Sequence, residues 1–245
     1  MTHHFTLPIR TALVLLILFV FATTSAAQTG NQIDTTDVRS LYEAGSRLHD
    51  AGNYSMAQKF YFRAYNLAQK LPDDDPYKNQ HLALIYELYG DNYYTWKVWG
   101  ENSVLNYANA RIYYREAGHY WYLLYGKNNL YTARIFNKMA SCWLQIENPD
   151  SAAVCIDEAL LAIQNTPDIN PQQQDYITLQ EGLSRTCLDL VEHYYSVRNY
   201  PKTMDYLQKM LAVEKQLSGE DSDVYKLVLH QIDLLKQEMA EPKKE

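Results

Sequence analysis

The sequence predicts an all-α protein built from antiparallel helix hairpins. Beyond the first 27 residues, apolar side chains recur at three- and four-residue steps, and no strictly alternating run is flanked by Asn-Gly or Asp-Gly turns. Residues suited to cap helix N-termini are spread over roughly 150 residues, which predicts many short helices. A series of small, large and aromatic residues also recurs, as closely packed helix pairs require.

The N-terminal segment predicts a secretory signal peptide. An apolar block over 12–22 follows Arg10, and the small residues Ser25 and Ala27 suit a signal peptidase. We expect cleavage after Ala27, which leaves a soluble exported chain, in the periplasm of a bacterium, with no further membrane contact. The alternative is an uncleaved membrane anchor, but this block covers only about half of a ~30 Å hydrocarbon core. No cysteine follows the cut, so no lipid anchor is expected there.

Composition predicts a folded domain and argues against several functions. Of the 245 residues, 47% are hydrophobic and 21% are charged, which is typical of a globular protein. The formal net charge of −7 argues against a nucleic-acid-binding surface, which needs clustered Lys and Arg. The seven histidines lack metal-ligand spacing, and no phosphate-binding loop or nucleophile motif is present. We therefore expect no metal, no cofactor and no enzymatic activity.

The three cysteines lie among apolar neighbours on predicted helices, where small buried hydrophobes are expected. An odd number of cysteines leaves at least one thiol unpaired. Cys142 and Cys155 fall on the two helices of one predicted hairpin, so a disulfide between them stays open as an alternative in an oxidising compartment.

Several helix starts are marked by a residue that accepts hydrogen bonds from free backbone amides. In three places a proline follows, and proline has no amide hydrogen to lose in the first helical turn. The pairs with proline are Asp75-Pro76, Asn148-Pro149 and Asn170-Pro171, and the single residues are Asn53, Asn102 and Asn199.

A spacing pattern predicts how the helices pair. Gly45 is followed by Leu48, Gly52, Ala57, Tyr61 and Ala64. The small residues let two helices approach, the large ones fill the space beside them, and Gly52 makes the turn. Similar series are Gly90, Tyr93, Ser103, Tyr107 and Ala110; Ala140, Trp143, Ala152, Ile156 and Ala159; and Val191, Tyr194, Thr203, Leu207 and Met210.

This series resembles the tetratricopeptide repeat (TPR) family. The resemblance implies a right-handed superhelical stack of about four degenerate repeats over residues 37–218. Equivalent positions are 45, 50 and 51 residues apart, so the helices or connectors are longer than in the standard repeat of about 34 residues. The break between the second and third copies falls at Gly118 or at Gly126-Lys127-Asn128.

The ends of the repeat array are predicted from the same argument. The last repeat needs a cover, and an amphipathic capping helix is predicted within 219–240. Residues 28–36 and 241–245 are expected to be flexible.

Tyrosine is unusually abundant, with 22 copies, 11 of them between Tyr86 and Tyr131. One interpretation is that these rings fill wide gaps between long helices. The other is that some of them bind a ligand, because adjacent pairs such as Tyr93-Tyr94 point about 100° apart on a helix.

The TPR resemblance implies a concave groove lined by the first helix of each hairpin, with a protein or peptide segment as its ligand. The alternative is a glycan-binding protein that uses exposed Tyr and Trp rings. Arg134 and Arg185 could hold an acidic side chain there. The positions that line the groove are Tyr42, Ser46, His49, Glu87, Asp91, Tyr94, Arg134, Asn137, Ser141, Arg185, Glu192 and Tyr195.

Overall fold

The structure, a computed structural model, describes residues 37–96 and 103–240. Within these ranges it contains nine α-helices and no strand, which confirms the predicted all-α class. The predicted signal peptide, the flexible segment 28–36 and the tail 241–245 lie outside the described residues. No helix in the described ranges is long and apolar enough to cross a bilayer.

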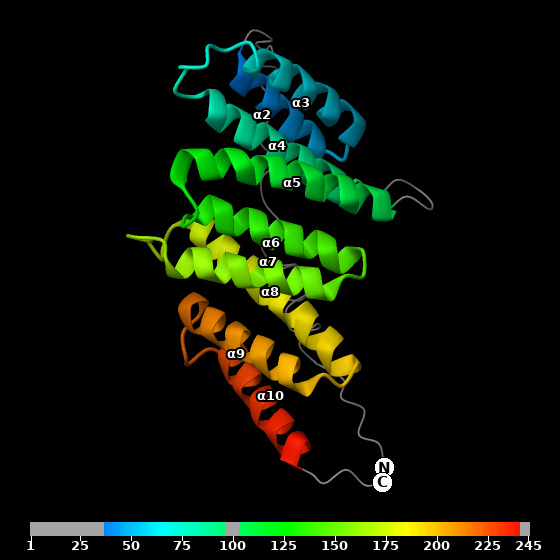
Figure 1. The fold of residues 1–245 in the computed structure, drawn as a ribbon, viewed down its shortest axis with the longest axis vertical. Helices are drawn as coiled ribbons and strands as arrows, with labels where there is room; N and C mark the ends of the chain where they lie inside the picture. Colours follow the sequence, from blue (N-terminus) through cyan, green and yellow to red (C-terminus); the bar gives the residue numbers. More distant parts are fainter. Residues whose placement is uncertain (1–36, 97–102, 241–245) are drawn as a thin grey trace. The chain divides into compact units, whose positions relative to one another are not determined.

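Eight of these helices form four hairpins, and the ninth packs on the last of them (Figure 1). The first helices of the hairpins, called A helices below, are α2 (Val38–Asp50), α4 (Lys78–Thr95), α6 (Leu130–Gln145) and α8 (Gln174–Ser196). The second helices, called B helices, are α3 (Tyr54–Ala68), α5 (Ser103–Tyr125), α7 (Pro149–Gln164) and α9 (Tyr200–Leu217). The last helix is α10 (Asp223–Ala240).

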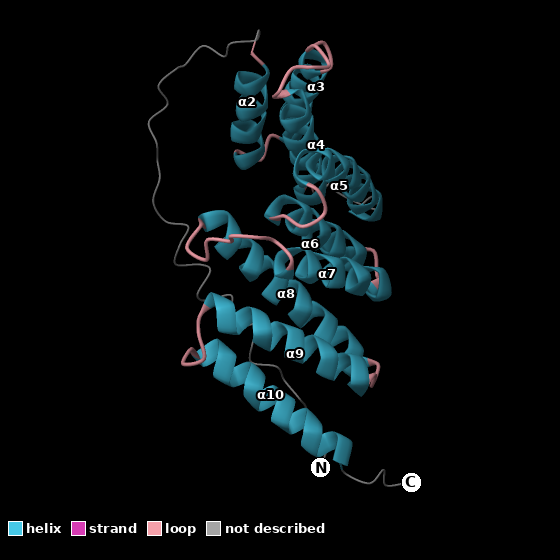
Figure 2. Ribbon diagram, turned by 60° about the vertical axis from the view of Figure 1, so that its left-hand side comes forward, coloured by secondary structure: helices cyan, strands magenta, loops and turns pink. Residues whose placement is uncertain are grey.

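Each hairpin also contacts the next one along the chain. The B helix of one hairpin packs on the A helix that follows it, so α3 contacts α4, α5 contacts α6 and α7 contacts α8. Figure 2 shows the same order of neighbours from a second direction. The apolar face of each hairpin is therefore buried by its neighbour, as expected of stacked repeats.

Three of the predicted N-caps are confirmed. Asn53, Asn148 and Asn199 each accept a hydrogen bond from the backbone amide three residues later. Two others are corrected, because α4 begins only at Lys78 and α8 only at Gln174. The Asp75 and Asn170 side chains instead accept from backbone amides two residues later, in Asx turns that precede the helices. Asn102 lies outside the described residues.

The close approach predicted for the first hairpin is present. A Cβ added at Gly45 would overlap the Tyr61 ring, and Ala57 and Ala64 are fully buried. Gly52 has φ = 76°, a left-handed conformation that glycine adopts without strain, and forms the turn. The series expected in the third and fourth hairpins is buried as well, at Ala152, Ile156, Ala159, Thr203, Leu207 and Met210.

The second hairpin corrects the predicted register. Gly90 faces Tyr114 rather than Tyr107, and a Cβ added at Gly90 would overlap the Tyr114 ring. Ala110 and Ala117, both fully buried, then occupy the places that Ala57 and Ala64 hold in the first hairpin. Seven residues, about two helical turns, separate the predicted register of α5 from the observed one.

The break between the second and third hairpins is at Gly126. Gly126 has φ = 76° and follows the end of α5, and the Asn129 side chain caps α6 by accepting from the Thr132 amide. Gly118 lies inside α5, where a Cβ would come 3.2 Å from Cγ2 of Ile135.

Most rings of the tyrosine-rich segment pack on one another. Tyr113 of α5 stacks on Tyr89 and Tyr93 of α4, with centroids 4.9 and 5.3 Å apart. Trp121 of α5 stacks on Tyr131 of α6 at 4.2 Å. In these clusters the rings fill the space between helices, as the packing interpretation expects.

The capping helix α10 buries Val228, Ile232 and Leu235. Gln231 is buried with them. The helix begins at Asp223. Residues 218–222 form the turn that lets α10 pack on α9.

Candidate interaction surface on the A helices

The polar side chains of neighbouring A helices bond to one another, and the strongest set joins α4 to α6. Arg134 donates from Nε and Nη2 to the two carboxylate oxygens of Glu87, both at 2.8 Å. Lys138 Nζ lies 2.8 Å from Glu87 Oε1 and donates to both oxygens of Asp91 at 2.7 and 2.8 Å. Two cations of α6 therefore bind two carboxylates of α4 in one network.

The B helix α5 contributes two further hydrogen-bond donors to this network. The Trp121 indole Nε1 donates to Glu87 Oε2 at 3.2 Å, and the Tyr114 hydroxyl donates to Asp91 Oδ1 at 2.8 Å. Trp121 and Tyr114 are buried, so both donors also belong to the packed core. The carboxylates are thus fixed by donors on both sides.

Glu87 is only 5% exposed, yet it stays charged. Burial alone would raise the pKa of Glu87, but the Lys138 and Arg134 charges overcome this effect and lower the pKa to about 2. Burial likewise opposes the charge of Lys138, and the carboxylates of Asp91 and Glu87 raise the pKa of Lys138. At neutral pH the network is a compensated set of two positive and two negative charges.

Other A helices are joined by hydrogen bonds that involve no carboxylate. His49 of α2 lies 3.3 Å (Nδ1) from Asn92 Oδ1 and 3.2 Å (Nε2) from Thr95 Oγ1 of α4. Asn137 Oδ1 of α6 accepts from Thr186 Oγ1 of α8 at 3.0 Å. We call the bonded set the A-helix strip; it consists of His49, Glu87, Asp91, Asn92, Thr95, Arg134, Asn137, Lys138 and Thr186.

The predicted groove residues thus fall into two groups. Six of them bond to other helices of the chain: His49, Glu87, Asp91, Arg134, Asn137 and Tyr195, whose hydroxyl donates to Glu238 of α10 at 3.0 Å. Two expectations are corrected by this result. Glu87 is buried rather than surface-exposed, and the donors of Arg134 that face Glu87 are engaged within the chain.

Of the other six predicted residues, one is exposed and five, Ser46 and Ser141 among them, are half-buried. Arg185 is exposed on α8. Tyr42 is half-buried beside His81 of α4, with ring centroids 6.0 Å apart. Tyr94 is half-buried against Tyr107 of α5, and burial raises its pKa to about 12. Glu192 on α8 is half-buried. As ligand-binding residues, all these positions stay predictions.

Lys138 is the network residue that sequence reasoning missed. It lies four residues after Arg134 on α6, as Asp91 lies four residues after Glu87 on α4. Two cations and two carboxylates at the same helical spacing on neighbouring A helices were the available signal, because residues four apart share one helix face.

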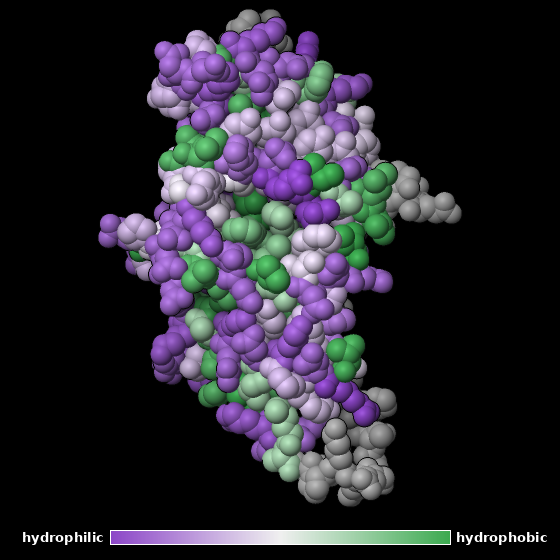
Figure 3. Space-filling model, in the orientation of Figure 1, coloured by the Kyte–Doolittle hydropathy of each residue, from purple (hydrophilic) through white to green (hydrophobic). Residues whose placement is uncertain are grey.

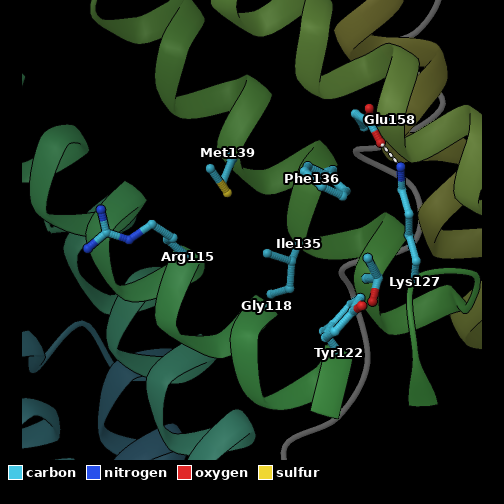
Figure 4. A pocket seen from close by; sticks show the side chains of 9 residues that line it. Arg115, Gly118, Tyr122, Lys127, Ile135, Phe136, Met139 and Glu158 are labelled. Atoms are coloured by element: carbon cyan, nitrogen blue, oxygen red, sulfur yellow. Dashed lines mark ion pairs between the residues drawn. The ribbon is translucent and has the colours of Figure 1, made fainter. Parts of the chain in front are cut away.

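A separate cavity of about 490 Å³ lies between α5, α6 and α7 (Figure 4). Gly118, Ile135, Phe136 and Met139 form its apolar part. Arg115 lies at one end of it and the Lys127–Glu158 ion pair (2.8 Å) at the other. Tyr122 and Thr132 complete the lining. The groove positions predicted from the repeats include none of these residues, because the cavity uses Thr132, Ile135, Phe136 and Met139 of α6, whereas the predicted groove uses Arg134, Asn137 and Ser141 of that helix.

The three cysteines of the described residues are free and buried. Burial raises the pKa of the three thiols, to about 12 for Cys142 and Cys187 and about 11 for Cys155. In the described ranges, no three His, Cys, Asp or Glu side chains are grouped so that they could hold a metal ion.

Comparison with known proteins gives structural neighbours but no sequence family. No family model and no curated protein matches the sequence. Among solved structures, the crystal structure of BtubC (BKLC) from P. vanneervenii is similar, with 18% identity and a TM-score of 0.53 over 85% of this chain and 84% of that chain.

Two structures of nearly identical TPR-like repeats, from a kinesin light chain candidate of Podosopora anserina, are more distant. The first has 10% identity and a TM-score of 0.46 over 86% of this chain and 100% of that chain. The second, a single-substitution variant of that protein, has 11% identity and the same TM-score over 85% and 99%. The glycine-to-tyrosine packing of the hairpins and the likeness to BtubC together show that this chain has a TPR-like helical-repeat fold.

Proposed function

We propose that this protein is an exported interaction scaffold that binds a segment of a partner protein along its A helices. The observation that carries the proposal is the A-helix strip, in which α2 bonds to α4, α4 to α6 and α6 to α8. These bonds align the polar faces of four successive hairpins. A surface that is fixed before binding loses little conformational entropy when a ligand binds.

The chemistry of this surface suits a peptide better than a purely charged ligand. The two cations and the two carboxylates of the network compensate each other's charge, so the strip offers no large field of one sign. Arg185 is exposed beside it and can pair with a carboxylate of the partner. A protein segment supplies the mixed polar and apolar groups that match such a surface.

Ring packing argues against the glycan-binding alternative. Sugar rings stack on open aromatic faces, but Tyr113 has Tyr89 and Tyr93 stacked on it. Trp121 likewise stacks on Tyr125 and Tyr131. The faces of these rings are therefore covered within the chain, which favours the protein-binding proposal.

Export is part of the proposal and rests on the apolar block 12–22 and the small residues before Gln28. Intact-mass measurement of the protein from a periplasmic fraction should give a chain that begins at Gln28. Recovery of the uncleaved chain in membranes would show that the segment is an anchor instead.

A non-catalytic role is also proposed, and the buried cysteines support it. A nucleophilic thiol needs a lowered pKa and access to substrate. Cys142 and Cys187 are fully buried, and burial raises their pKa values to about 12.

Site-specific photo-crosslinking in cells tests the binding surface. Benzoylphenylalanine is placed at Arg185 on A helix α8 and, as the matched control, at Phe62, which is 57% exposed on B helix α3. We expect protein adducts at position 185 and none above background at position 62, with the adducts identified by mass spectrometry. Equal adducts at both positions, or carbohydrate adducts at 185, would contradict the proposal.

A further inference from the structure

The cavity between α5, α6 and α7 lies on a different surface from the A-helix strip. Its walls come from two B helices, α5 and α7, and its floor comes from α6. On the face drawn in Figure 3, hydrophobic surface gathers over these middle helices. The proposed binding along the A helices does not use these residues, so the cavity is a separate candidate site.

The cavity is open because a side chain is missing from its wall. Gly118 faces Ile135, and a Cβ at this position would come 3.2 Å from Ile135 Cγ2. The lining of α6 runs from Thr132 to Met139, about two helical turns or 10 Å. This length matches the spacing between the first and last apolar side chains of an i, i+3, i+4, i+7 helix face.

Apolar surface continues outside the cavity. Tyr122 on its lining is 55% exposed. Ile112 lies one turn before Arg115 on α5 and is 43% exposed, and Val154 lies one turn before Glu158 on α7 and is 63% exposed. A small molecule enclosed in the cavity would leave this rim uncovered, whereas a helix laid over α6 would cover it.

The charges around the cavity favour an acidic ligand. Arg115 is 64% exposed and pairs only with its neighbour Glu116, at 3.1 Å, among the described residues. Arg111, one turn earlier on α5, lies over the Trp143 ring at 4.1 Å. The lining itself holds two cations, Arg115 and Lys127, and one carboxylate, Glu158, although the whole chain carries a net charge of −7.

We propose that this cavity is a docking site for an acidic amphipathic helix of a partner protein. An apolar side chain of the helix enters the space beside Gly118, between Phe136 and Met139. Its neighbours along the apolar face contact Tyr122 and Val154. Its carboxylates pair with Arg115, which exchanges an exposed contact with Glu116 for one that the bound helix shields from water.

Isothermal titration of the mature chain with two synthetic peptides tests the proposal. Both peptides carry leucines at i, i+3, i+4 and i+7; the remaining positions are mainly Glu in one and mainly Lys in the other. The variants are Arg115→Glu and Tyr122→Ser. The matched controls on B helix α3 are Arg63→Glu and Phe62→Ser, because Phe62 is as exposed as Tyr122.

We expect the acidic peptide to bind the native chain and to bind each cavity variant at least tenfold more weakly. The α3 controls should bind like the native chain, and the basic peptide should bind at least tenfold more weakly than the acidic one. Circular dichroism checks that every variant stays helical, which is expected because all four side chains are exposed.

Three results would overturn the proposal. They are no binding of the acidic peptide, equal binding of the two peptides, and equal losses in the cavity and α3 variants. Dodecanoate serves as a further probe, because it carries an apolar chain and a carboxylate without a helix. If dodecanoate binds more tightly than the acidic peptide and displaces it, the cavity is a site for small amphiphiles instead.

Discussion

Gly90 of α4 lies directly against the ring of Tyr114 of α5, and Gly45 of α2 has the same relation to Tyr61 of α3. In both hairpins the missing side chain of the A helix makes room for a tyrosine of the B helix. The Tyr114 hydroxyl then reaches Asp91 of the ion-pair network. One ring therefore links hairpin packing to the A-helix strip.

The first prediction follows from this contact. Gly45→Ala and Gly90→Ala should each lower the free energy of unfolding by about 1–3 kcal/mol, because the added methyl overlaps a ring that is held by the core. Alanine's better helix propensity, up to about 1 kcal/mol, offsets only part of this loss. Guanidinium unfolding curves measure the change.

Gly118→Ala is the matched control, because its methyl would meet only the Ile135 side chain, with Cγ2 at 3.2 Å and Cβ at 4.0 Å. We expect its free energy of unfolding to stay within about 0.5 kcal/mol of the native value. If all three alanine variants are equally stable, the glycine-to-tyrosine contacts do not limit how closely the helices approach.

The second prediction concerns the register of α5. Tyr114→Ala should lower the free energy of unfolding by about 3–5 kcal/mol, because it empties a fully packed site and removes one of the two side chains that donate to Asp91. Tyr107→Ala, the control, removes a half-buried ring and should cost clearly less. Thermal unfolding of both variants tests this order; a larger loss for Tyr107→Ala would restore the register expected from the sequence.

This register shows why helix class is easier to predict than helix pairing. The apolar periodicity of α5 is unchanged by a shift of seven residues, about two turns, so Tyr107 and Tyr114 both fit the pattern. In the first hairpin, the short turn at Gly52 leaves no such freedom, and the predicted pairing of Gly45 with Ala57 and Tyr61 is confirmed.

The third prediction is a pH dependence of stability caused by Glu87. Lys138 and Arg134 outweigh burial and lower its pKa from a usual 4.5 to about 2. A lowered pKa stabilises the folded state fully above about pH 4.5, and this contribution is lost as the pH falls towards 2. A shift of this size corresponds to a free energy on the order of 3 kcal/mol.

Urea unfolding between pH 6 and pH 2.5 measures this effect in the native chain and in Glu87→Gln. The variant should be less stable at pH 6 by about 3–5 kcal/mol, because it removes a buried carboxylate that pairs with two half-buried cations, and its stability should fall less steeply with acid. Glu181→Gln, on an exposed site of α8, is the control. Parallel pH profiles for the native chain and Glu87→Gln would show that Glu87 does not cause the pH dependence of stability.

The candidate surface was only partly predictable for a related reason. Helical spacing places Glu87 and Asp91 on one A helix, and Arg134 on the next, at positions expected to face one groove. Whether these side chains bind a ligand or one another depends on the distance between α4 and α6, and this distance cannot be derived from the sequence. In the structure, Arg134 Nε lies 2.8 Å from Glu87 Oε1. Lys138, which was not predicted, is the fourth member of the network, with Nζ 2.8 Å from the same oxygen.

The fourth prediction is that the three cysteines stay reduced and unreactive in the folded protein. All three are free and buried, and burial raises the pKa of the Cys155 thiol to about 11. Since the thiolate is the reactive form, labelling by Ellman's reagent at pH 8 should be slow in buffer and complete, at three thiols per chain, in guanidinium.

Val154→Cys is the control for this labelling, because its side chain is 63% exposed beside Cys155 and should label within the mixing time. A loss of two reactive thiols in guanidinium without reductant would reveal the alternative disulfide between Cys142 and Cys155. Fast labelling of the native chain would instead show that these helices open readily, which contradicts the tight packing at Ala140 and Ile156.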